Sequence, residues 1–255
     1  MLKVSDCVKN KWNIFFVSVI FVLCCVIALL SCNIYTLSDN NNEATESEAK
    51  PNPTEISDII LDVPTLCQLP TLPTGCETVS ATMVMNYYDI DISATEFAEK
   101  WLLCDYQFIK SGDKTFGPDP NEVFVGDPFE AYGYGCYAPA MEKAINESEL
   151  NCKAEVITKK SLDELCSEYI SKGEPVLVWV TLRMGEPKEG ESWYIDDDTP
   201  FTWTTGEHCM VLVGYNDKYY FFNDPTTGGI VAYKKDISQQ RFEVFGMQAL
   251  RISAE

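Results

Sequence analysis

The distribution of apolar residues divides the chain into three stretches. Residues 12–30 form an uncharged, strongly apolar run of 19 residues, whereas residues 33–57 are rich in Asn, Glu, Ser, Thr and Pro. From residue 59 onward, short apolar segments alternate with polar ones. A segment with few apolar side chains cannot offset its ordering entropy by burial. We therefore expect a disordered linker at residues 33–58 and one folded domain at residues 59–255.

In the first part of this domain, apolar residues recur at helical spacing. Val79, Met83 and Tyr87 lie four residues apart and follow a stretch of Pro, Thr and Gly, which predicts a helix over residues 78–88 with Cys76 at its N-terminus. Further helix starts are indicated by sequences that are typical of capping boxes at residues 93–96 and 161–164, and by Pro139.

The second part of the domain contains short runs rich in β-branched and aromatic residues, which predict strands. These runs lie at residues 176–182, 209–215, 219–222, 230–233 and 247–252. Asn216 and Asp217 predict a hairpin turn between the second and third runs. Because helices come first and strands follow, the predicted fold class is α+β.

Two stretches rich in turn-forming residues, 105–128 and 185–205, are predicted to be long irregular loops. Long loops of this kind often serve a function, so both are candidates for the wall of a substrate cleft. The second stretch contains Trp193 and Trp203 close together in sequence. We expect Trp193 either to line the cleft or to cap the core.

The first 32 residues have the features of an export signal. Lys3, Lys9 and Lys11 precede the apolar run, which at ~1.5 Å per residue would nearly cross a ~30 Å hydrocarbon core. Leu-Leu-Ser-Cys at residues 29–32 resembles the lipobox of bacterial lipoproteins, in which Cys32 would be lipidated. The alternative is an uncleaved single-pass anchor. In both cases we expect residues 1–32 to attach the chain to a membrane, with the folded domain on the extracytoplasmic face of the cell membrane.

Charge and cysteine content exclude several classes of partner. The formal net charge is −20, and no basic stripe with interleaved aromatic residues is present, so we expect no nucleic-acid partner. The chain has 11 cysteines but a single histidine and no C-x-x-C pair, so a zinc site would have to be nearly all thiolate. We expect no metal and no cofactor. Seven cysteines follow Cys32, and because this number is odd we expect at least one free thiol.

The candidate chemistry centres on Cys76 and His208. A helix N-terminus and an adjacent imidazolium both lower a thiol pKa from its usual ~8.5, and His208 is the only histidine that could supply the second effect. Asp224, 16 residues further on, ends the next strand of the predicted hairpin and could orient the imidazole. Gln68 is a candidate oxyanion donor. Cys76 and His208 are 132 residues apart, within the ~130–150 typical of papain-type enzymes.

Six motifs resemble, in order, those of the peptidase C39-like family. They are Leu-Asp-Val-Pro at residues 61–64, Gln-Leu-Pro at 68–70, Pro-Thr-Gly-Cys-Glu at 73–77, Gly-Tyr-Gly-Cys-Tyr-Ala-Pro at 133–139, Glu-His-Cys-Met-Val-Leu-Val-Gly-Tyr at 207–215 and Asn-Asp-Pro at 223–225. The resemblance implies a papain-like cysteine peptidase fold with a helical N-terminal half packed on an antiparallel sheet. It also implies active-site roles for Gln68, Cys76, His208 and Asp224, but it does not define the substrate, which we expect to be a peptide or a protein.

The expected function is that of a membrane-anchored, extracytoplasmic cysteine peptidase that hydrolyses peptide or amide bonds. Two alternatives stay open. One is acyl transfer to an amine, as in transglutaminases, because the sequence does not distinguish water from an amine as acceptor. The other is a non-catalytic surface lipoprotein that binds a ligand on the same fold. Glu77 and Glu207 flank the two reactive residues, and as anions they would oppose thiolate formation if their side chains pointed toward the sulfur.

Overall fold

The structure is a computed structural model that describes residues 58–255. The predicted signal or anchor at residues 1–32, the lipidation site at Cys32 and the predicted linker up to residue 57 lie outside the described residues. Across residues 58–255, no helix is long and apolar enough to span a bilayer.

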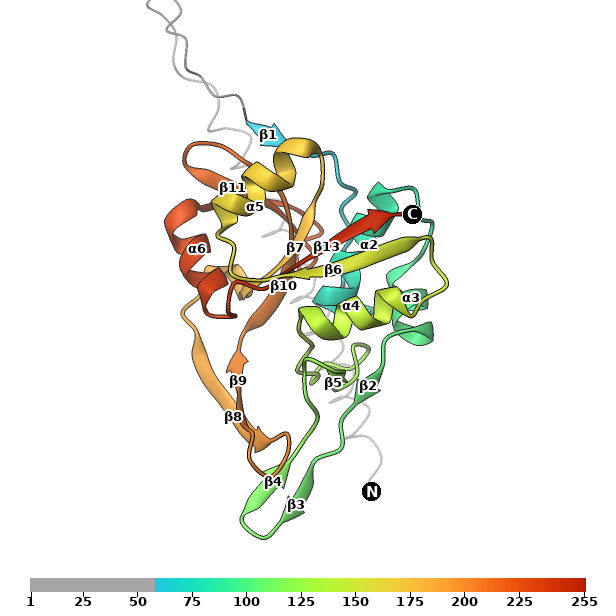
Figure 1. Ribbon diagram of the computed structural model, residues 1–255, viewed down its shortest axis with the longest axis vertical. Coiled ribbons are helices and arrows are strands. Elements are labelled where there is room, and N and C mark those ends of the chain that lie inside the picture. Colours follow the sequence, from blue (N-terminus) through green and yellow to red (C-terminus); the bar gives the residue numbers. More distant parts are fainter. Residues whose placement is uncertain (1–57) are drawn as a thin grey trace, which may run out of the picture. The chain divides into compact units, whose positions relative to one another are not determined.

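A seven-stranded antiparallel sheet forms the centre of the domain (Figure 1). Its strands are β1 (Ile59–Ile60), β6 (Cys152–Ile157), β7 (Val176–Thr181), β10 (Glu207–Tyr215), β11 (Tyr219–Asp224), β12 (Gly229–Lys234) and β13 (Ala249–Ala254). Their order is β12-β11-β10-β7-β13-β6, and β1 pairs with the end of β10. The central strand β7 consists of Val, Leu, Trp and Thr residues that are all buried, which is typical of a strand covered on both faces.

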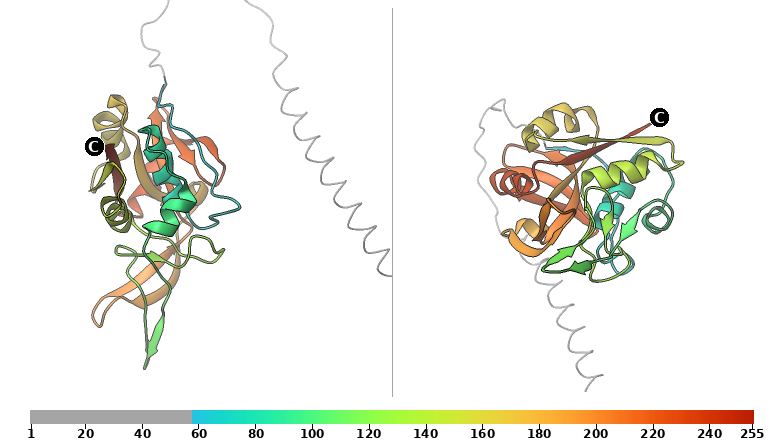
Figure 2. Two further views of the ribbon diagram at one scale, coloured as in Figure 1. Left: turned by 90° about the vertical axis from the view of Figure 1, so that its right-hand side faces the viewer. Right: turned by 60° about the horizontal axis from the view of Figure 1, so that its bottom comes forward.

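Helices cover both faces of this sheet (Figures 1 and 2). Leu177 and Trp179 of β7 pack on the side of α2 (Cys76–Tyr87), α3 (Ala94–Lys100) and α4 (Ala138–Asn146). Val176 and Val178 pack on the side of α5 (Leu162–Glu168), the 3₁₀ helix η1 (Ile170–Lys172) and α6 (Lys235–Glu243). Because side chains alternate along a strand, the two apolar faces of β7 hold two separate cores together.

A second, smaller sheet lies below the first in Figure 1. It contains β3 (Ile109–Ser111), β4 (Lys114–Phe116), β8 (Lys188–Tyr194) and β9 (Pro200–Thr205). Outside this sheet, β2 (Cys104–Asp105) pairs with β5 (Phe124–Val125), and the 3₁₀ helix η2 (Leu182–Met184) follows β7. The prediction of irregular loops at residues 105–128 and 185–205 is therefore wrong in part, because both contain hairpins. Their strands are short or mostly polar, so the apolar alternation that signals a strand is missing.

Most other predicted elements are present. The first helix begins at Cys76 and ends at Tyr87, and Ser161 forms a complete capping box with Glu164 at the start of α5. Asn216 Oδ1 accepts hydrogen bonds from the backbone N–H groups of two following residues, both at 2.8 Å, in the predicted turn. The fold class is mixed α and β with a large antiparallel sheet, as expected. The N-terminal half is not purely helical, however, because β2 to β5 separate α3 from α4.

Candidate active site

A cavity of about 640 Å³ lies where the start of α2 meets the start of β10. Its walls contain three of the four predicted site residues, and the fourth, Asp224, lies in contact with one of them, His208. The wall includes Gln68, Cys76, Trp203, Glu207, His208 and Thr226. Residues distant in sequence thus meet at one concave site, which is the usual form of a small-molecule or peptide site.

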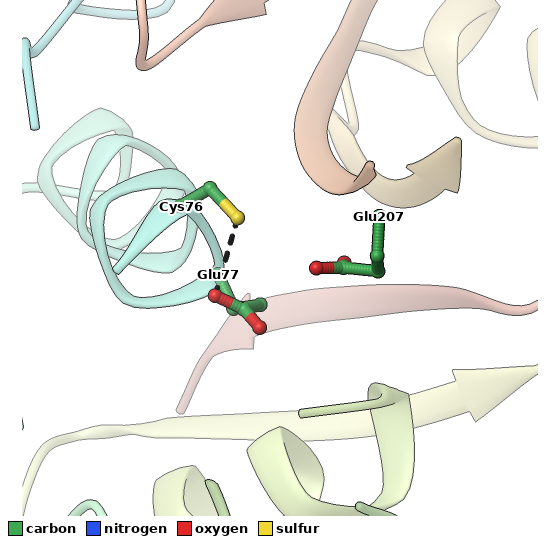
Figure 3. Close-up of side chains that lie close together, drawn as sticks. All are labelled: Cys76, Glu77 and Glu207. Carbon is green, nitrogen blue, oxygen red and sulfur yellow. Dashed lines mark hydrogen bonds between the residues drawn. The ribbon is translucent and has the colours of Figure 1, made fainter. Parts of the chain in front are cut away.

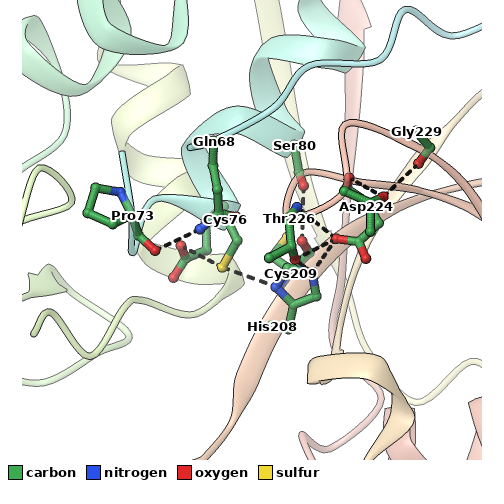
Figure 4. Close-up of polar contacts among 11 residues, drawn as sticks. Gln68, Pro73, Cys76, Ser80, His208, Cys209, Asp224, Thr226 and Gly229 are labelled. Carbon is green, nitrogen blue, oxygen red and sulfur yellow. Dashed lines mark hydrogen bonds and ion pairs between the residues drawn. The ribbon is translucent and has the colours of Figure 1, made fainter. Parts of the chain in front are cut away.

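Cys76 is the first residue of α2 and is buried. The N–H groups in the first turn of a helix have no intrahelical acceptor, and the preceding Gly75 offers no side-chain acceptor to cap them. The backbone N–H of Cys209 lies 3.5 Å from Cys76 Sγ and points to it. Because Cys209 directly follows His208, this contact brings the thiol next to the strand that carries the imidazole (Figure 4).

His208 and Asp224 form a buried pair (Figure 4). His208 Nε2 lies 2.8 Å from Asp224 Oδ1, so Nδ1 is the ring nitrogen left for the thiol. The same carboxylate oxygen accepts hydrogen bonds from Thr226 Oγ1 at 2.7 Å and from the Thr226 N–H at 2.8 Å. Burial alone would raise the pKa of Asp224, but the hydrogen bond and charge of His208, together with Thr226, lower it. The pair therefore favours a carboxylate beside the imidazole.

Gln68 reaches the cavity from the loop before α2. Its Nε2 donates to Pro73 O at 2.8 Å, and its own backbone N–H donates to Pro225 O at 2.8 Å. The first bond closes the loop before α2 on itself, and the second ties this loop to the turn that follows Asp224. One of the two amide N–H groups of Gln68 is thus engaged, which leaves the second as a possible donor toward the cavity.

Both flanking glutamates point toward the thiol. Cys76 Sγ lies 3.2 Å from Glu77 Oε2, and ligand atoms of Cys76, Glu77 and Glu207 all lie within 4.8 Å of one another (Figure 3). Burial raises the pKa of the Cys76 thiol well above its usual value, and the charges of Glu77 and Glu207 raise it further. Burial likewise raises the pKa of Glu77 to about 7 and that of Glu207 well above its usual value.

The expectation of a lowered thiol pKa therefore does not hold for this arrangement, because burial and the charges of Glu77 and Glu207 outweigh the hydrogen bond from the Cys209 N–H, which lowers the pKa. Three ligand atoms at this spacing would also fit around a metal ion. Glu77 Oε1 already accepts the Cys136 N–H at 2.6 Å, however, and acids with raised pKa values favour protons. We assign no metal ligands here.

Residues 60–250 match the model of the Peptidase_C39 like family. The chain belongs to this family. The Bacillus subtilis (strain 168) protein YvpB, described as uncharacterized, is 32% identical over 157 residues, which are 61% of this chain and 60% of YvpB. The chain thus matches less than two thirds of the length of that relative.

A solved structure gives the same assignment. A crystal structure of a Bacillus anthracis protein assigned to the C39-like peptidases aligns with a TM-score of 0.68 at 27% identity, over 78% of this chain and 98% of that one. Xylellain, a cysteine protease from Xylella fastidiosa, aligns over 78% of this chain and 85% of its own with a TM-score of 0.37 at 11% identity, which carries no argument. The C39-like assignment rests on the family match and the first structure.

The aromatic residues of β8 and β9 divide between the core and the cavity of this C39-like domain. Trp193 is only 2% exposed, packs against Trp203 and Val125, and donates its Nε1–H to Pro118 O at 2.9 Å. Trp203 belongs to the same cluster but also lines the cavity. The interpretation of Trp193 as a cleft wall is therefore wrong, because its ring is enclosed by its neighbours.

Sequence reasoning did not single out Thr226. Its hydroxyl lies 3.2 Å from His208 Nε2 and donates to Asp224, so it contacts both members of the pair. The sequence signal was present, since an Asp followed two residues later by Thr is typical of a local turn closed by side-chain hydrogen bonds. In this C39-like domain that turn fixes the carboxylate.

Proposed function

We propose that the chain is a cysteine peptidase that hydrolyses peptide or amide bonds. Cys76 is the nucleophile, His208 the general base, Asp224 the group that orients the imidazole and Gln68 an oxyanion donor. The observation that carries this proposal is the 2.8 Å bond between His208 Nε2 and Asp224 Oδ1, formed beside the cavity into which Cys76 opens at a helix start. An extracytoplasmic, membrane-anchored location is also proposed, on residues 1–32 alone.

The reaction follows from the free atoms of the site. The Cys76 proton moves to His208 Nδ1 while Sγ attacks the carbonyl carbon, and Asp224 holds the imidazolium by its Nε2–H. His208 then returns the proton to the leaving amine as the C–N bond breaks, which gives an acyl-enzyme. A water molecule, deprotonated by His208, releases the acid and regenerates the thiol.

The negative oxygen of the tetrahedral intermediate needs donors that are in place beforehand. Gln68 offers its second amide N–H, and the first turn of α2 offers backbone N–H groups without intrahelical acceptors. Removal of one such donor typically lowers kcat by ~10²–10³-fold. Gln68→Ala is therefore expected to reduce turnover far more than it reduces binding.

The test is labelling of the folded protein with a library of electrophilic, peptide-like probes, followed by mapping of the adduct by mass spectrometry. We expect one fast adduct at Cys76, abolished in Cys76→Ala and slowed at least ~10²-fold in His208→Ala, since general base catalysis contributes about this much. The exposed free thiol Cys67 provides the matched control, because Cys67→Ala should leave labelling at Cys76 unchanged.

Each other outcome points to a different function. A folded protein without an adduct at Cys76 would contradict the proposal and favour a non-catalytic binding protein. An adduct that forms equally fast without His208 would show a reactive thiol but no catalytic pair. Products joined to an added amine, formed in preference to hydrolysis products, would identify an acyl transferase.

A further inference from the structure

Two carboxyl groups stand beside the proposed nucleophile in a part of the site that the reaction above does not use. Glu77 follows Cys76 on α2, and Glu207 precedes His208 on β10. Glu77 is fully buried, and Glu207 Oε1 is a buried atom without a hydrogen-bond partner. An orphaned buried carboxyl oxygen is costly and calls for an explanation.

The backbone around the two acids leaves room for them. Gly135 has a φ of +129°, in a region that favours glycine, and a Cβ atom there would lie 2.5 Å from Glu77 Oε1 and 3.1 Å from Glu207 Oε2. The next residue, Cys136, donates its N–H to Glu77 Oε1 at 2.6 Å. Helix, strand and loop thus together enclose a pocket for this pair.

Within the described part of the chain, no Lys or Arg lies along the cavity wall to neutralise the two carboxyl groups, and the imidazole of His208 is already paired with Asp224. The titratable groups that face the pair from the packed elements are those of Cys76, Cys104, Cys136, Tyr137, His208 and Cys209. A buried and a half-buried carboxyl group this close cannot both ionise cheaply, because the charge of one raises the pKa of the other, so their titrations are coupled.

We propose that Glu77 and Glu207 form a coupled carboxyl pair that keeps the Cys76 thiol protonated in the free protein and sets the pH range in which its thiolate is available. Both act through Cys76 and are therefore positioning residues. As the pH rises and the pair loses its protons, negative charge accumulates next to Sγ and opposes thiolate formation. Because the pKa of Glu77 is raised to about 7, we expect this change near neutral pH. For peptidase activity, the inference rests on the function proposed above.

The test uses alkylation and needs no substrate. The rate at which iodoacetamide modifies Cys76 is measured on the full-length chain between pH 5 and 10, in the presence of a metal chelator, for the wild type, Glu77→Gln, Glu207→Gln and the double variant. The midpoint of each curve of alkylation rate against pH reports the pKa of the Cys76 thiol. We expect this midpoint to lie at least one pH unit lower in the double variant than in the wild type, so that alkylation is about tenfold faster at pH values below both midpoints. Each single variant should show a smaller decrease.

The controls separate this inference from other effects. Glu99→Gln removes one exposed carboxylate from α3 and should leave the midpoint unchanged. A folded double variant with the wild-type midpoint would overturn the inference while leaving the proposed function intact, provided that His208→Ala still slows labelling. Failure of the His208 effect would instead count against the proposed function. If the double variant does not fold, Glu207→Gln decides alone, because Glu207 Oε1 has no hydrogen bond to lose.

Discussion

The ionisation of Glu77 affects the free energy of folding. Its side chain is fully buried, and burial raises its pKa from 4.5 to about 7 although the Cys136 N–H opposes the rise. A carboxyl group whose pKa is higher in the folded than in the unfolded state favours folding less once it is charged. The ionisation of Glu77 contributes nothing to the free energy of folding well below pH 4.5. Its contribution becomes unfavourable as the pH rises to about 7 and is constant above that.

Glu77→Gln should therefore stabilise the protein in a pH-dependent way. At pH 8 we expect its free energy of unfolding to exceed that of the wild type by up to about 3 kcal/mol, since one pKa unit corresponds to ~1.4 kcal/mol. At pH 4 the two proteins should be nearly equal, because Glu77 is then protonated in both states. Urea unfolding at both pH values measures the difference. An equal difference at pH 4 and pH 8 would show that the effect is not electrostatic.

Among the secondary-structure elements, the β8–β9 hairpin links the aromatic core to the cavity. Trp193 on β8 pairs with Phe201 on β9, while Trp203, two residues on, reaches the cavity wall. The strands themselves carry few apolar residues. Their stability comes from this cluster and from the pairing of β8 with β4. A substitution in the hairpin should therefore affect either stability or binding, depending on the residue.

Trp193 and Trp203 should respond differently to substitution. Trp193→Ala is expected to lower the free energy of unfolding by ~3–5 kcal/mol, because a large buried ring is removed, with KM of the remaining folded protein close to that of the wild type. Trp203→Phe keeps most of the packing and should raise KM. The measurements are thermal unfolding and steady-state kinetics on a substrate found by labelling. An increase in KM for Trp193→Ala without loss of stability would contradict this assignment.

At the scale of the whole domain, the central sheet couples the two cores. β7, β10 and β13 each send alternate side chains into both, so neither core can lose its packing without exposing the other face of these strands. We therefore expect the chain from β1 to β13 to unfold as one cooperative unit.

Residues 58–255, produced alone, should unfold in a single transition. Far-ultraviolet circular dichroism follows the helices and strands, and tryptophan fluorescence follows the aromatic cluster and Trp179, which is buried in β7. We expect the two signals to give the same midpoint in urea, as for a two-state domain. Two separate midpoints would show that the smaller sheet or one core unfolds independently.

Local signals in the sequence were enough to predict the start of α2 at Cys76, the capping box at Ser161 and the pairing of His208 with Asp224. A hairpin turn at Asn216 limits which residues of the two strands can meet, so a contact 16 residues apart follows from local pattern. The order and spacing of motifs then indicated the C39-like family. In each case the physical cause acts over a few residues, or over adjacent strands.

Only the tertiary structure decided how distant elements face one another. Glu77 and Glu207 are 130 residues apart, and their meeting at the Cys76 sulfur depends on the rotation of α2 and its packing against β10. The burial of Trp193 depends in the same way on contacts with residues 118 and 125. The raised pKa of the thiol follows from desolvation and from these neighbours. Burial and through-space charge depend on distances in the folded domain, which the sequence pattern does not contain.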